Sequence, residues 1–508
     1  MPLSSNDFYI VPDLIRKHAK AQASRTALID GDTIFSYNEL DSQMDCVAAA
    51  LQQAGLKVGE SIALCGVNSV PYVVLFLGAL RAGIAPALIA PSSTADSIAT
   101  MTQNSQAKLL FLDEDLSTNV TPLIDDTVKI IPLTTKAVGA WYASAPQQPE
   151  TVTIERDLPF NIIYSSGTTG APKGIVQSHG MRSEHIDRAG VVFGYGPSSV
   201  TLIATPLYSN TTLVSFIPAI ALGGAIVIAG KFNAANYIRL ASLHRATHAM
   251  LVPVQYKRIM ALADFEEYDL NSFLVKFCTS APFASGLKAD IVKRWPGGLI
   301  EFYGMTEGGG TCVLAAHLFP EKLHTVGTPA EGHDIRLIDD EGKEVGPGEV
   351  GEVVGSSNAM MKGYHGQPEK TRESEWYDPS GKRFIRTGDV GIFDEDGFLT
   401  LMDRKKDMII SGGFNIYPSD LEAELITHEA IADVAVIGVP SEDWGETPVA
   451  VVVKADGAIV DAEAIKSWLS ERVGKTQRLH DVIFIDELPR SAIGKVLKRE
   501  LRDNYIGK

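Results

Sequence analysis

Short apolar runs alternate with helical stretches in the first third of the chain, and this alternation narrows the fold class more than any other feature. The pattern predicts strands at 61–65, 85–89 and 109–112, and helices at 71–81 and 93–104. Strands that alternate with helices in this way form a parallel sheet with helices on both faces. We therefore expect an α/β fold.

A chain of 508 residues is too long for one ordinary core, so more than one domain is expected. After a connector at 134–157 the alternation resumes, and from about His333 short strands with turns predict a small β-barrel or sheet. The charged segment 403–407 has no apolar period and predicts a hinge. We expect an N-terminal domain at 1–402, built from two doubly wound-like αβ subdomains plus the small β-barrel. A mobile α+β C-terminal domain would occupy 408–508.

The charge balance excludes one class of partner. Asp and Glu outnumber Lys and Arg by 62 to 45, which gives a net charge of −17. A nucleic-acid partner calls for a basic face, so we expect none. The cysteines form no Cys-x-x-Cys pair, which favours a reducing compartment, the cytoplasm, over a zinc site or a disulfide framework. They are Cys46, Cys65, Cys278 and Cys312.

One apolar stretch, 213–230, is uncharged and long enough to suggest a membrane span. Pro218 and the Gly223-Gly224 pair interrupt it, and 225–228 has the character of a strand. We therefore expect a buried helix, a turn and a strand, with no membrane span. The first residues lack the basic start and apolar core of a signal peptide.

A stretch rich in glycine and hydroxyl groups begins where the apolar run 160–163 ends. It consists of Ser165, Ser166, Gly167, Thr168, Thr169, Gly170 and then Lys173. Glycine lets the backbone approach a ligand, and successive N–H groups in such a turn point at an anion. With the charge of Lys173, the stretch is suited to hold a polyphosphate. A polar surface loop is the alternative, and a P-loop is excluded because Gly174 and an apolar pair continue a strand where that motif opens a helix.

Four further stretches stand out downstream. Residues 301–307 follow an expected strand and precede Gly308-Gly309-Gly310, and 386–389 (Arg-Thr-Gly-Asp) end another expected strand. Residues 411–418 form a second glycine loop, after which Ser419 and Glu422 have capping-box spacing for a helix with Leu421, Leu425 and Ile426 inward. Residues 489–495 end in Lys495. Taken singly, each stretch is a strand end, a turn or a solvated basic tail.

Taken in order, these stretches resemble the motifs of the adenylate-forming (AMP-binding) superfamily. That family includes acyl-CoA synthetases, aryl-CoA ligases, peptide-synthetase adenylation domains and beetle luciferases. The resemblance covers essentially the whole chain. It implies that the glycine loop holds the phosphates of ATP and that Lys495 is a catalytic residue on the mobile domain.

The resemblance also implies roles for the second motif and its neighbours. Tyr303 would stack on adenine, Thr306 would contact the α-phosphate, and Glu307 would help to hold Mg²⁺, with Thr168 as a second metal contact. One or two carboxylates plus substrate phosphates are typical of Mg²⁺. Further nucleotide contacts are implied for Ser280, Ala281, Pro282, Glu301, Phe302, Gly304 and Met305.

In the last third, the resemblance implies that Asp389 binds the ribose hydroxyls, for which a carboxylate with two acceptor oxygens is suited. Arg404 would join it, and Lys406 would be the hinge residue. Contacts on the pantetheine and CoA side are implied for Gly412, Gly413 and Trp444. The family's aromatic-Lys-x-Pro element is Thr-Gln-Arg-Leu here, so Arg478 is left to meet a CoA phosphate.

The acid is expected to bind beside the second motif. Its pocket would be formed by Tyr208, Ser209, Asn210, Thr211, Phe302, Gly304 and Gly308. Ser209 stands where many relatives have histidine or an aromatic residue, which alters the pocket and the thiol entrance. A polar side lined by hydroxyls favours an aryl or functionalised acid over a long plain alkyl chain.

These expectations describe an ATP-dependent acid–CoA ligase. A carboxylate would displace pyrophosphate from ATP, and the thiol of CoA would then displace AMP from the acyl-adenylate. An adenylation enzyme that loads a carrier-protein phosphopantetheine is the alternative within the family. A non-catalytic nucleotide-binding protein is the alternative of another class, and nothing specific favours a luciferase-like oxygenase. The sequence leaves open a monomer or a homodimer.

Overall fold

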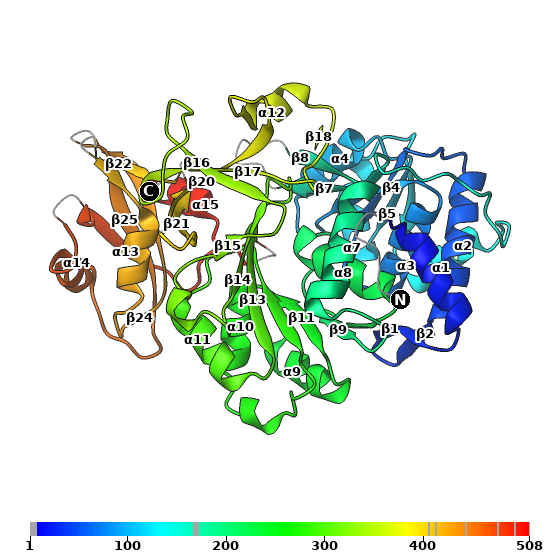
Figure 1. Cartoon of the computed structure of the whole chain (residues 1–508), viewed down its shortest axis with the longest axis horizontal. Helices are drawn as coiled ribbons and strands as arrows, with labels where there is room; N and C mark the ends of the chain where they lie inside the picture. The colour runs from blue at the N-terminus through cyan, green and yellow to red at the C-terminus, as the bar shows by residue number, and fades with distance from the viewer. Residues whose placement is uncertain are drawn as a thin grey trace. The chain divides into compact units, whose positions relative to one another are not determined.

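The computed structural model describes residues 8–165, 172–404, 407–411, 414–441, 444–474, 477–491 and 494–506 (Figure 1). The chain forms two compact units. The first comprises Met1–His324, Pro329–Asp334 and Ser356–Ile385, and the second comprises Thr325–Thr328, Ile335–Gly355 and Arg386–Lys508. The predicted hinge residue Lys406 lies outside the described residues, and the predicted boundary between 402 and 403 stays a prediction.

A seven-stranded sheet forms part of the first unit, and its central strands are parallel, as the alternating pattern predicts. In spatial order its strands are β18 (Gly363–Tyr364), β8 (Lys173–Ser178), β7 (Pro159–Ser165), β4 (Ala85–Ile89), β3 (Ser61–Cys65), β5 (Leu109–Leu112) and β6 (Lys129–Pro132). The strands β8 and β18 are added antiparallel at one edge. The accompanying helices are α2 (Tyr37–Gln53), α3 (Val70–Arg81), α4 (Ala95–Asn104), α5 (Glu114–Val120), η1 (Thr121–Leu123) and α6 (Thr135–Tyr142).

A nine-stranded sheet supplies the rest of the framework. Its order is β15 (Thr328–Pro329), β14 (Thr311–Ala315), β13 (Gly298–Gly304), β12 (Val275–Cys278), β11 (His248–Leu251), β9 (Val200–Ile203), β10 (Ala225–Ile228), β1 (Thr26–Asp30) and β2 (Thr33–Ser36). The run from β13 to β1 is parallel. Its helices are α1 (Val11–Ala21), α7 (His179–Phe193), α8 (Asn210–Ala221), α9 (Ala234–Leu243), α10 (Pro253–Met260), η2 (Phe265–Glu267), α11 (Ser285–Arg294) and η3 (Pro320–Lys322).

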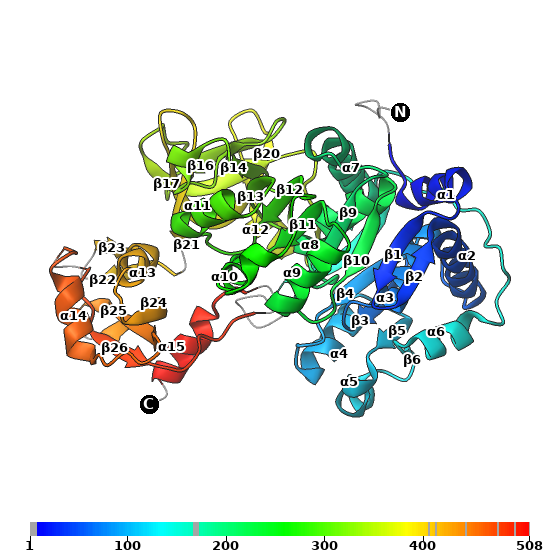
Figure 2. The same cartoon turned by 90° about the horizontal axis from the view of Figure 1, so that it is seen from below.

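One hydrophobic core joins the two sheets through the helices that pack on both of them. Phe76 of α3 makes edge-on ring contacts with Phe160 of β7, at 5.9 Å between centroids, and with Phe216 of α8, at 6.3 Å. Helix α2 begins with a capping box formed by Ser36 and Glu39, and it lies beside α1, β1 and β2 (Figure 2). The two sheets of this unit are therefore held by shared helices, and the site described below lies within it.

Two small sheets complete the chain. The region predicted as a β-barrel or sheet forms a five-stranded sheet of β16 (Asp334–Ile338), β17 (Val350–Ser356), β20 (Arg383–Phe393), β19 (Glu375–Tyr377) and β21 (Leu399–Arg404), with α12 (Pro368–Glu373) nearby in sequence. The last part is α+β, as predicted. Its strands are β23 (Phe414–Ile416), β22 (Ile409–Ser411), β25 (Gly445–Lys454), β24 (Ile431–Ser441) and β26 (Asp481–Phe484), and its helices are α13 (Pro418–Leu425), α14 (Ala462–Ser470) and α15 (Lys498–Ile506).

Several local predictions were wrong. The connector at 134–157 contains α6, capped by Thr134. Helix α13 begins at Pro418, so Ser419 lies inside it and donates to the Met402 carbonyl, while Ile426 is 42% exposed. Residues 386–389 lie within the long strand β20, whose register shifts after Asp389. For α6 a local capping signal was overlooked, whereas at Ser419 and at Asp389 a tertiary hydrogen bond or a strand pairing accompanies the observed boundary.

The apolar stretch 213–230 forms most of α8, a turn at Gly223 (φ +89°) and β10, as predicted. Within the described ranges, no helix has both the length and the apolar character needed to cross a membrane.

Candidate active site

The glycine-rich stretch joins the ends of two paired strands. Strand β7 ends at Ser165 and β8 begins at Lys173, and these two residues are partners in the antiparallel ladder. The predicted phosphate contacts at 166–170 lie outside the described residues. The ladder places Lys173 opposite Ser165, so it lies next to these residues in the chain, and its role toward phosphates stays a prediction.

Lys173 and Glu307 both contact Tyr364, a residue that was not predicted from the sequence to belong to the site. The Tyr364 hydroxyl donates to Glu307 Oε1 at 2.9 Å, and Lys173 Nζ lies 5.0 Å from the centre of the Tyr364 ring. Burial and the Glu307 carboxylate raise the pKa of Tyr364, so its hydroxyl remains a proton donor at neutral pH. A cation and a carboxylate separated by more than 130 residues in sequence are thereby brought to one place.

Strand β13 turns alternate residues of the second motif to opposite faces. Phe302 and Gly304 line a cavity, whereas Glu301 is buried in an ion pair with Lys288 of α11. The carboxylate of Glu301, predicted to contact the nucleotide, is therefore already engaged by Lys288. Thr306 also lines the cavity, and its carbonyl accepts a hydrogen bond from Gln177 Nε2 at 3.0 Å.

Gly308 shows why the motif is followed by glycines. Its φ is +75°, and a Cβ at this position would lie 1.9 Å from the Ala359 carbonyl oxygen. Ser357 Oγ donates to the Gly308 carbonyl at 2.8 Å. Only glycine permits this approach, which holds the segment from Ser357 to Tyr364 against the motif.

The loop after β12 also contributes to the cavity. Ser280 has φ +82°, a left-handed conformation that is uncommon for a residue other than glycine. Its hydroxyl is 2.6 Å from that of Thr211, and both side chains line the cavity together with Thr279. Such strain is often found at functional sites. The neighbouring Ala281 and Pro282 do not line the cavity.

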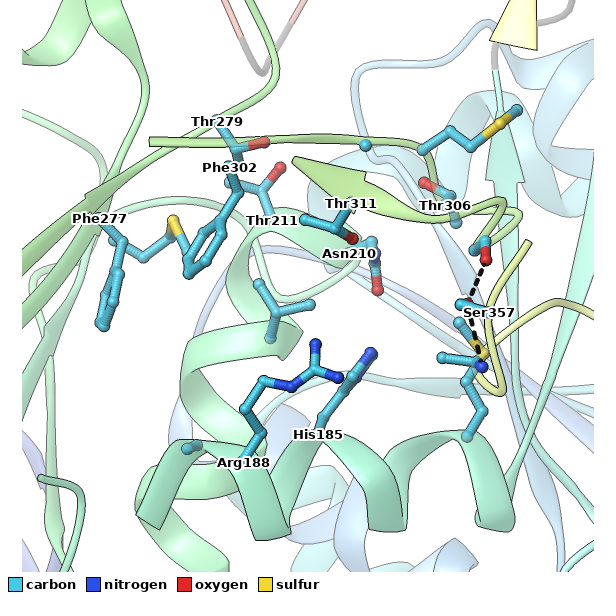
Figure 3. Close-up of a pocket in the computed structure, with 18 of the residues that line it drawn as sticks. His185, Arg188, Asn210, Thr211, Phe277, Thr279, Phe302, Thr306, Thr311 and Ser357 are labelled. Carbon is cyan, nitrogen blue, oxygen red and sulfur yellow. Dashed lines mark hydrogen bonds between the residues drawn. The ribbon is translucent and has the colours of Figure 1, made fainter. Parts of the chain in front are cut away.

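The cavity has a free volume of about 180 Å³ and one strongly aromatic side (Figure 3). Phe277 and Phe302 stack at 5.5 Å between ring centres, and Phe193 meets both edge-on at 5.0 and 5.7 Å. An apolar cavity of about 150 Å³ can hold a benzene ring. The space therefore suits an acid with one ring or a comparable compact body.

Helix α7 supplies the polar side of the cavity. His185 and Arg188 are three residues apart and therefore lie on one face of the helix, and Figure 3 shows their side chains next to each other. Arg188 donates to His333 Nε2 at 3.1 Å and to the Glu331 carbonyl at 3.1 Å. Burial, assisted by the nearby arginines, lowers the pKa of His185 to about 3 and that of His333 to about 4, so both are neutral at pH 7.

A second arginine is buried beneath this wall. Arg182 donates to the side-chain oxygens of Gln177, Asn161 (3.2 Å) and Asn210 (3.0 Å). Burial lowers the pKa of Arg182 to about 9, so the guanidinium remains charged at neutral pH. Its partners are neutral amides, so the positive charge is available to an anion near Thr306 and Asn210.

The structure brings part of the predicted acid pocket together in one cavity, and its role in binding the acid stays a prediction. Asn210, Thr211, Phe302, Gly304 and Gly308 line the cavity. Tyr208 and Ser209 do not, and Ser209 instead caps α8 by accepting from the Thr211 N–H. His185 and Arg188 on α7, and His333, also line the cavity and were not predicted. The three-residue spacing of His185 and Arg188, on the helix that follows β8, was the available signal for the first two of these.

The remaining predicted contacts lie in the second unit. Asp389 and Arg404 are partners in the β20–β21 ladder, and Trp444 is 59% exposed. The backbone N–H of Lys495 donates to Ser491 Oγ at 3.2 Å. Gly412 and Gly413 lie outside the described residues. The roles of all these residues, and of Arg478, stay predictions.

Comparison with known proteins identifies the family of the chain. The model of the family described as "AMP-binding enzyme" matches residues 15–365, which is more than half of the chain. The chain belongs to the AMP-binding enzyme family. A second model, of the AMP-binding enzyme C-terminal domain, matches residues 420–495. The family predicted from the motifs and the α/β architecture predicted from the alternation of strands and helices are both confirmed.

Known AMP-binding enzymes resemble the chain over nearly its whole length. Feruloyl-CoA synthase of an Amycolatopsis species is 31% identical over 499 residues, covering 96% of this chain and 98% of the relative. Fatty acid–[acyl-carrier-protein] ligase ScoC of Streptomyces coeruleorubidus is 30% identical over 507 residues, covering 96% and 95%. The crystal structure of ATP-bound MatB from Rhodopseudomonas palustris aligns with a TM-score of 0.89 at 28% identity, covering 97% and 99%.

Proposed function

We propose that this AMP-binding enzyme is an ATP-dependent carboxylic acid–CoA ligase that acts on a compact aryl or functionalised acid. The observation that carries the proposal is that Lys173 and Glu307 both contact Tyr364. Thr306, the residue before Glu307, lines the cavity. The predicted ligase class agrees with the relatives named above. An aromatic wall formed by Phe193, Phe277 and Phe302 supports a ring-bearing acid.

In the first half-reaction, an oxygen of the substrate carboxylate attacks the α-phosphorus of ATP, and the bond to pyrophosphate breaks. The reaction needs no side-chain nucleophile, only stabilisation of the negative charge that develops on the phosphates. Lys173 and Lys495 would supply positive charge, Thr306 would contact the α-phosphate, and Arg182 would favour the approaching carboxylate. In the second half-reaction, the thiol of CoA loses its proton, sulfur attacks the acyl carbon, and AMP leaves.

The site is compatible with one Mg²⁺ bound mainly through substrate. Glu307 accepts the Tyr364 hydroxyl on Oε1, which leaves Oε2 as a ligand. The described residues contain no cluster of three His, Cys, Asp or Glu side chains that could hold a metal by themselves. A single carboxylate plus phosphate oxygens is a usual arrangement for Mg²⁺. Bound there, Mg²⁺ would neutralise the phosphates as pyrophosphate leaves.

The test is release of AMP with a panel of benzoic, cinnamic and short alkyl acids. We expect AMP formation that requires both the acid and CoA, without any carrier protein. Activity only with a phosphopantetheinyl carrier protein would instead favour the carrier-loading reaction, to which the ligase ScoC points. ATP binding without acid-stimulated pyrophosphate exchange would refute both and leave a nucleotide-binding protein.

Lys495 provides a second test. Removal of one charge-stabilising donor typically lowers the rate about 10²- to 10³-fold, so Lys495→Ala should slow adenylation by this order. Thioester formation from pre-formed acyl-adenylate should change much less, because the ammonium acts on the leaving pyrophosphate. Arg499→Ala, an exposed cation in the same tail, is the matched control. Equal losses in both half-reactions would contradict the role of Lys495.

A further inference from the structure

The polar wall of the cavity carries one cation that no carboxylate neutralises among the described residues. Arg188 is the only lysine or arginine that lines the described cavity, and no Asp or Glu lines it. The two groups that accept from Arg188, His333 Nε2 and the Glu331 carbonyl, are both neutral. In a protein of net charge −17, an uncompensated cation inside a ligand cavity indicates an anionic ligand group.

The arginines also determine which nitrogen of each histidine carries the proton. A guanidinium has donors and no acceptor, so His333 Nε2 must accept from Arg188, and the proton of this neutral ring lies on Nδ1. That Nδ1 is buried and has no hydrogen-bond partner among the described residues. By the same argument, Arg182 at 3.5 Å from His185 Nδ1 leaves the proton of His185 on Nε2. The wall therefore offers N–H donors from three side chains, and an oxyanion is the group that satisfies all of them.

Arg188 is well separated from the reacting end of the cavity. Arg182 contacts Gln177 and Asn210, and Gln177 in turn holds the Thr306 carbonyl. Arg188 follows Arg182 by six residues, which is about 9 Å along a helix at 1.5 Å per residue. Arg182 thus lies near the reacting carboxylate at Thr306, whereas Arg188 is too far along the helix to share it and needs a different anionic group.

We propose that the acid activated by this enzyme carries a second carboxylate at the far end of a compact, ring-sized body, and that Arg188 binds this carboxylate with help from His333 and His185. The inference rests on the proposed function, because it specifies the substrate class of the same site. The body of the acid lies against Phe277 and Phe302. Arg188 is then a residue that determines specificity and takes no part in the chemistry.

The experiment compares acids that differ only at the far end. Benzene-1,4-dicarboxylate and 4-carboxycinnamate are each paired with the monomethyl ester that blocks the far carboxylate. We expect kcat/KM for acid-dependent pyrophosphate exchange to be at least about 30-fold higher for the diacid, the lower end of the loss when one partner of a buried charge pair is removed. Equal use of diacid and ester by the unaltered enzyme would overturn the inference.

Variants then assign the preference to Arg188. Arg188→Met should remove or reverse the preference for the diacid, while the KM for ATP stays unchanged. Arg188→Lys keeps the charge and should retain part of the preference, which guards against a folding defect in the first variant. Arg239→Met, a change of an exposed arginine on α9, is the control for loss of one positive charge. A Met variant that loses activity on diacid and ester to the same extent would contradict the assignment.

Failure of the ligase activity can be told apart from failure of this inference. If no acid supports exchange, calorimetric binding of the diacid and its ester to the enzyme still measures the preference. Tighter binding of the diacid, lost in Arg188→Met, would support the anion site although the proposed reaction had failed. Equal binding of both compounds would overturn the anion site.

Discussion

Lys288 and Glu301 form a buried ion pair whose loss should weaken the wall of the cavity. Their side chains are 2% and 6% exposed, and the pair ties α11 to β13, the strand that carries Phe302. Lys288 Nζ also donates to the Leu323 carbonyl at 2.9 Å. Lys288→Met would leave the Glu301 carboxylate buried without its cation. We therefore expect a loss of stability in the first unit.

The magnitude follows from burial. Removing one partner of a buried ion pair costs about 3–5 kcal/mol, whereas replacing both partners by apolar groups is often neutral or stabilising. Burial raises the pKa of Glu301 to about 7, even though the Lys288 ammonium opposes this. A carboxyl group whose pKa is higher in the folded than in the unfolded state makes the fold less stable as pH rises through the folded-state pKa. Lys288→Met should thus cost about 3–5 kcal/mol at pH 8 and less at pH 6, where Glu301 can be protonated.

The assay is urea unfolding followed by tryptophan fluorescence, to which the buried Trp295 beside α11 contributes. Two compact units need not unfold together, so the free energy is taken from the transition that this signal reports. The double change Lys288→Met with Glu301→Leu should recover stability to within about 1 kcal/mol. Lys108→Met is the control, since its ion pair with Glu60 lies at the surface, with side chains 51% and 34% exposed, and such pairs contribute about 0–1 kcal/mol. An equal cost at pH 6 and pH 8, or a double variant no better than the single one, would refute the reasoning.

Three further outcomes are expected. Arg81→Met should lower the free energy of unfolding by up to about 3 kcal/mol, because the buried Asp45 carboxylate loses its 2.9 Å partner and keeps, among the described residues, only the partly exposed Arg16; urea unfolding measures this. A thiol reagent should modify only Cys46 in the folded protein and all four cysteines in denaturant, since the other three are buried and burial raises their pKa values. The contribution of His185 and His333 to stability should be full above pH 6.5 and fall as pH drops toward 4, because both rings are neutral in the fold but protonate when unfolded; in thermal unfolding at stepped pH, His333→Gln should lose less stability toward pH 4 than the unaltered protein does.

The framework of the first unit could be predicted from the sequence because its elements obey local rules. The strands at 61–65, 85–89 and 109–112 are fully buried apolar runs, and the structure has them at these bounds. The boundaries that failed, at Ser419 and at 386–389, are places where a hydrogen bond or strand pairing overrides a local preference. Local propensity decides where a helix or strand can form, but tertiary partners decide where it ends.

Candidate residues for phosphate binding could be proposed from the sequence in the same way. Glycine, lysine and acidic residues in a family-specific order pointed to Lys173, Thr306 and Glu307, because a backbone that must approach phosphates leaves glycines in the sequence. Tyr364 carried no such mark. Its contribution depends on β18 pairing with β8, a contact between segments almost 190 residues apart.

The amino-acid order was sufficient to indicate a nucleotide-dependent ligase, since motifs for binding triphosphate are contiguous and short. It was insufficient to define the cavity proposed for the acid, because that cavity is assembled from side chains on α7, β12, β13 and the segment near His333. Nothing in the sequence distinguishes Arg188 from the other arginines. Only the fold places it beside two neutral histidines in a cavity that no Asp or Glu of the described residues lines. Whether a charge is solvated or directed into a cavity depends on its three-dimensional surroundings, and those arise from packing between distant parts of the chain.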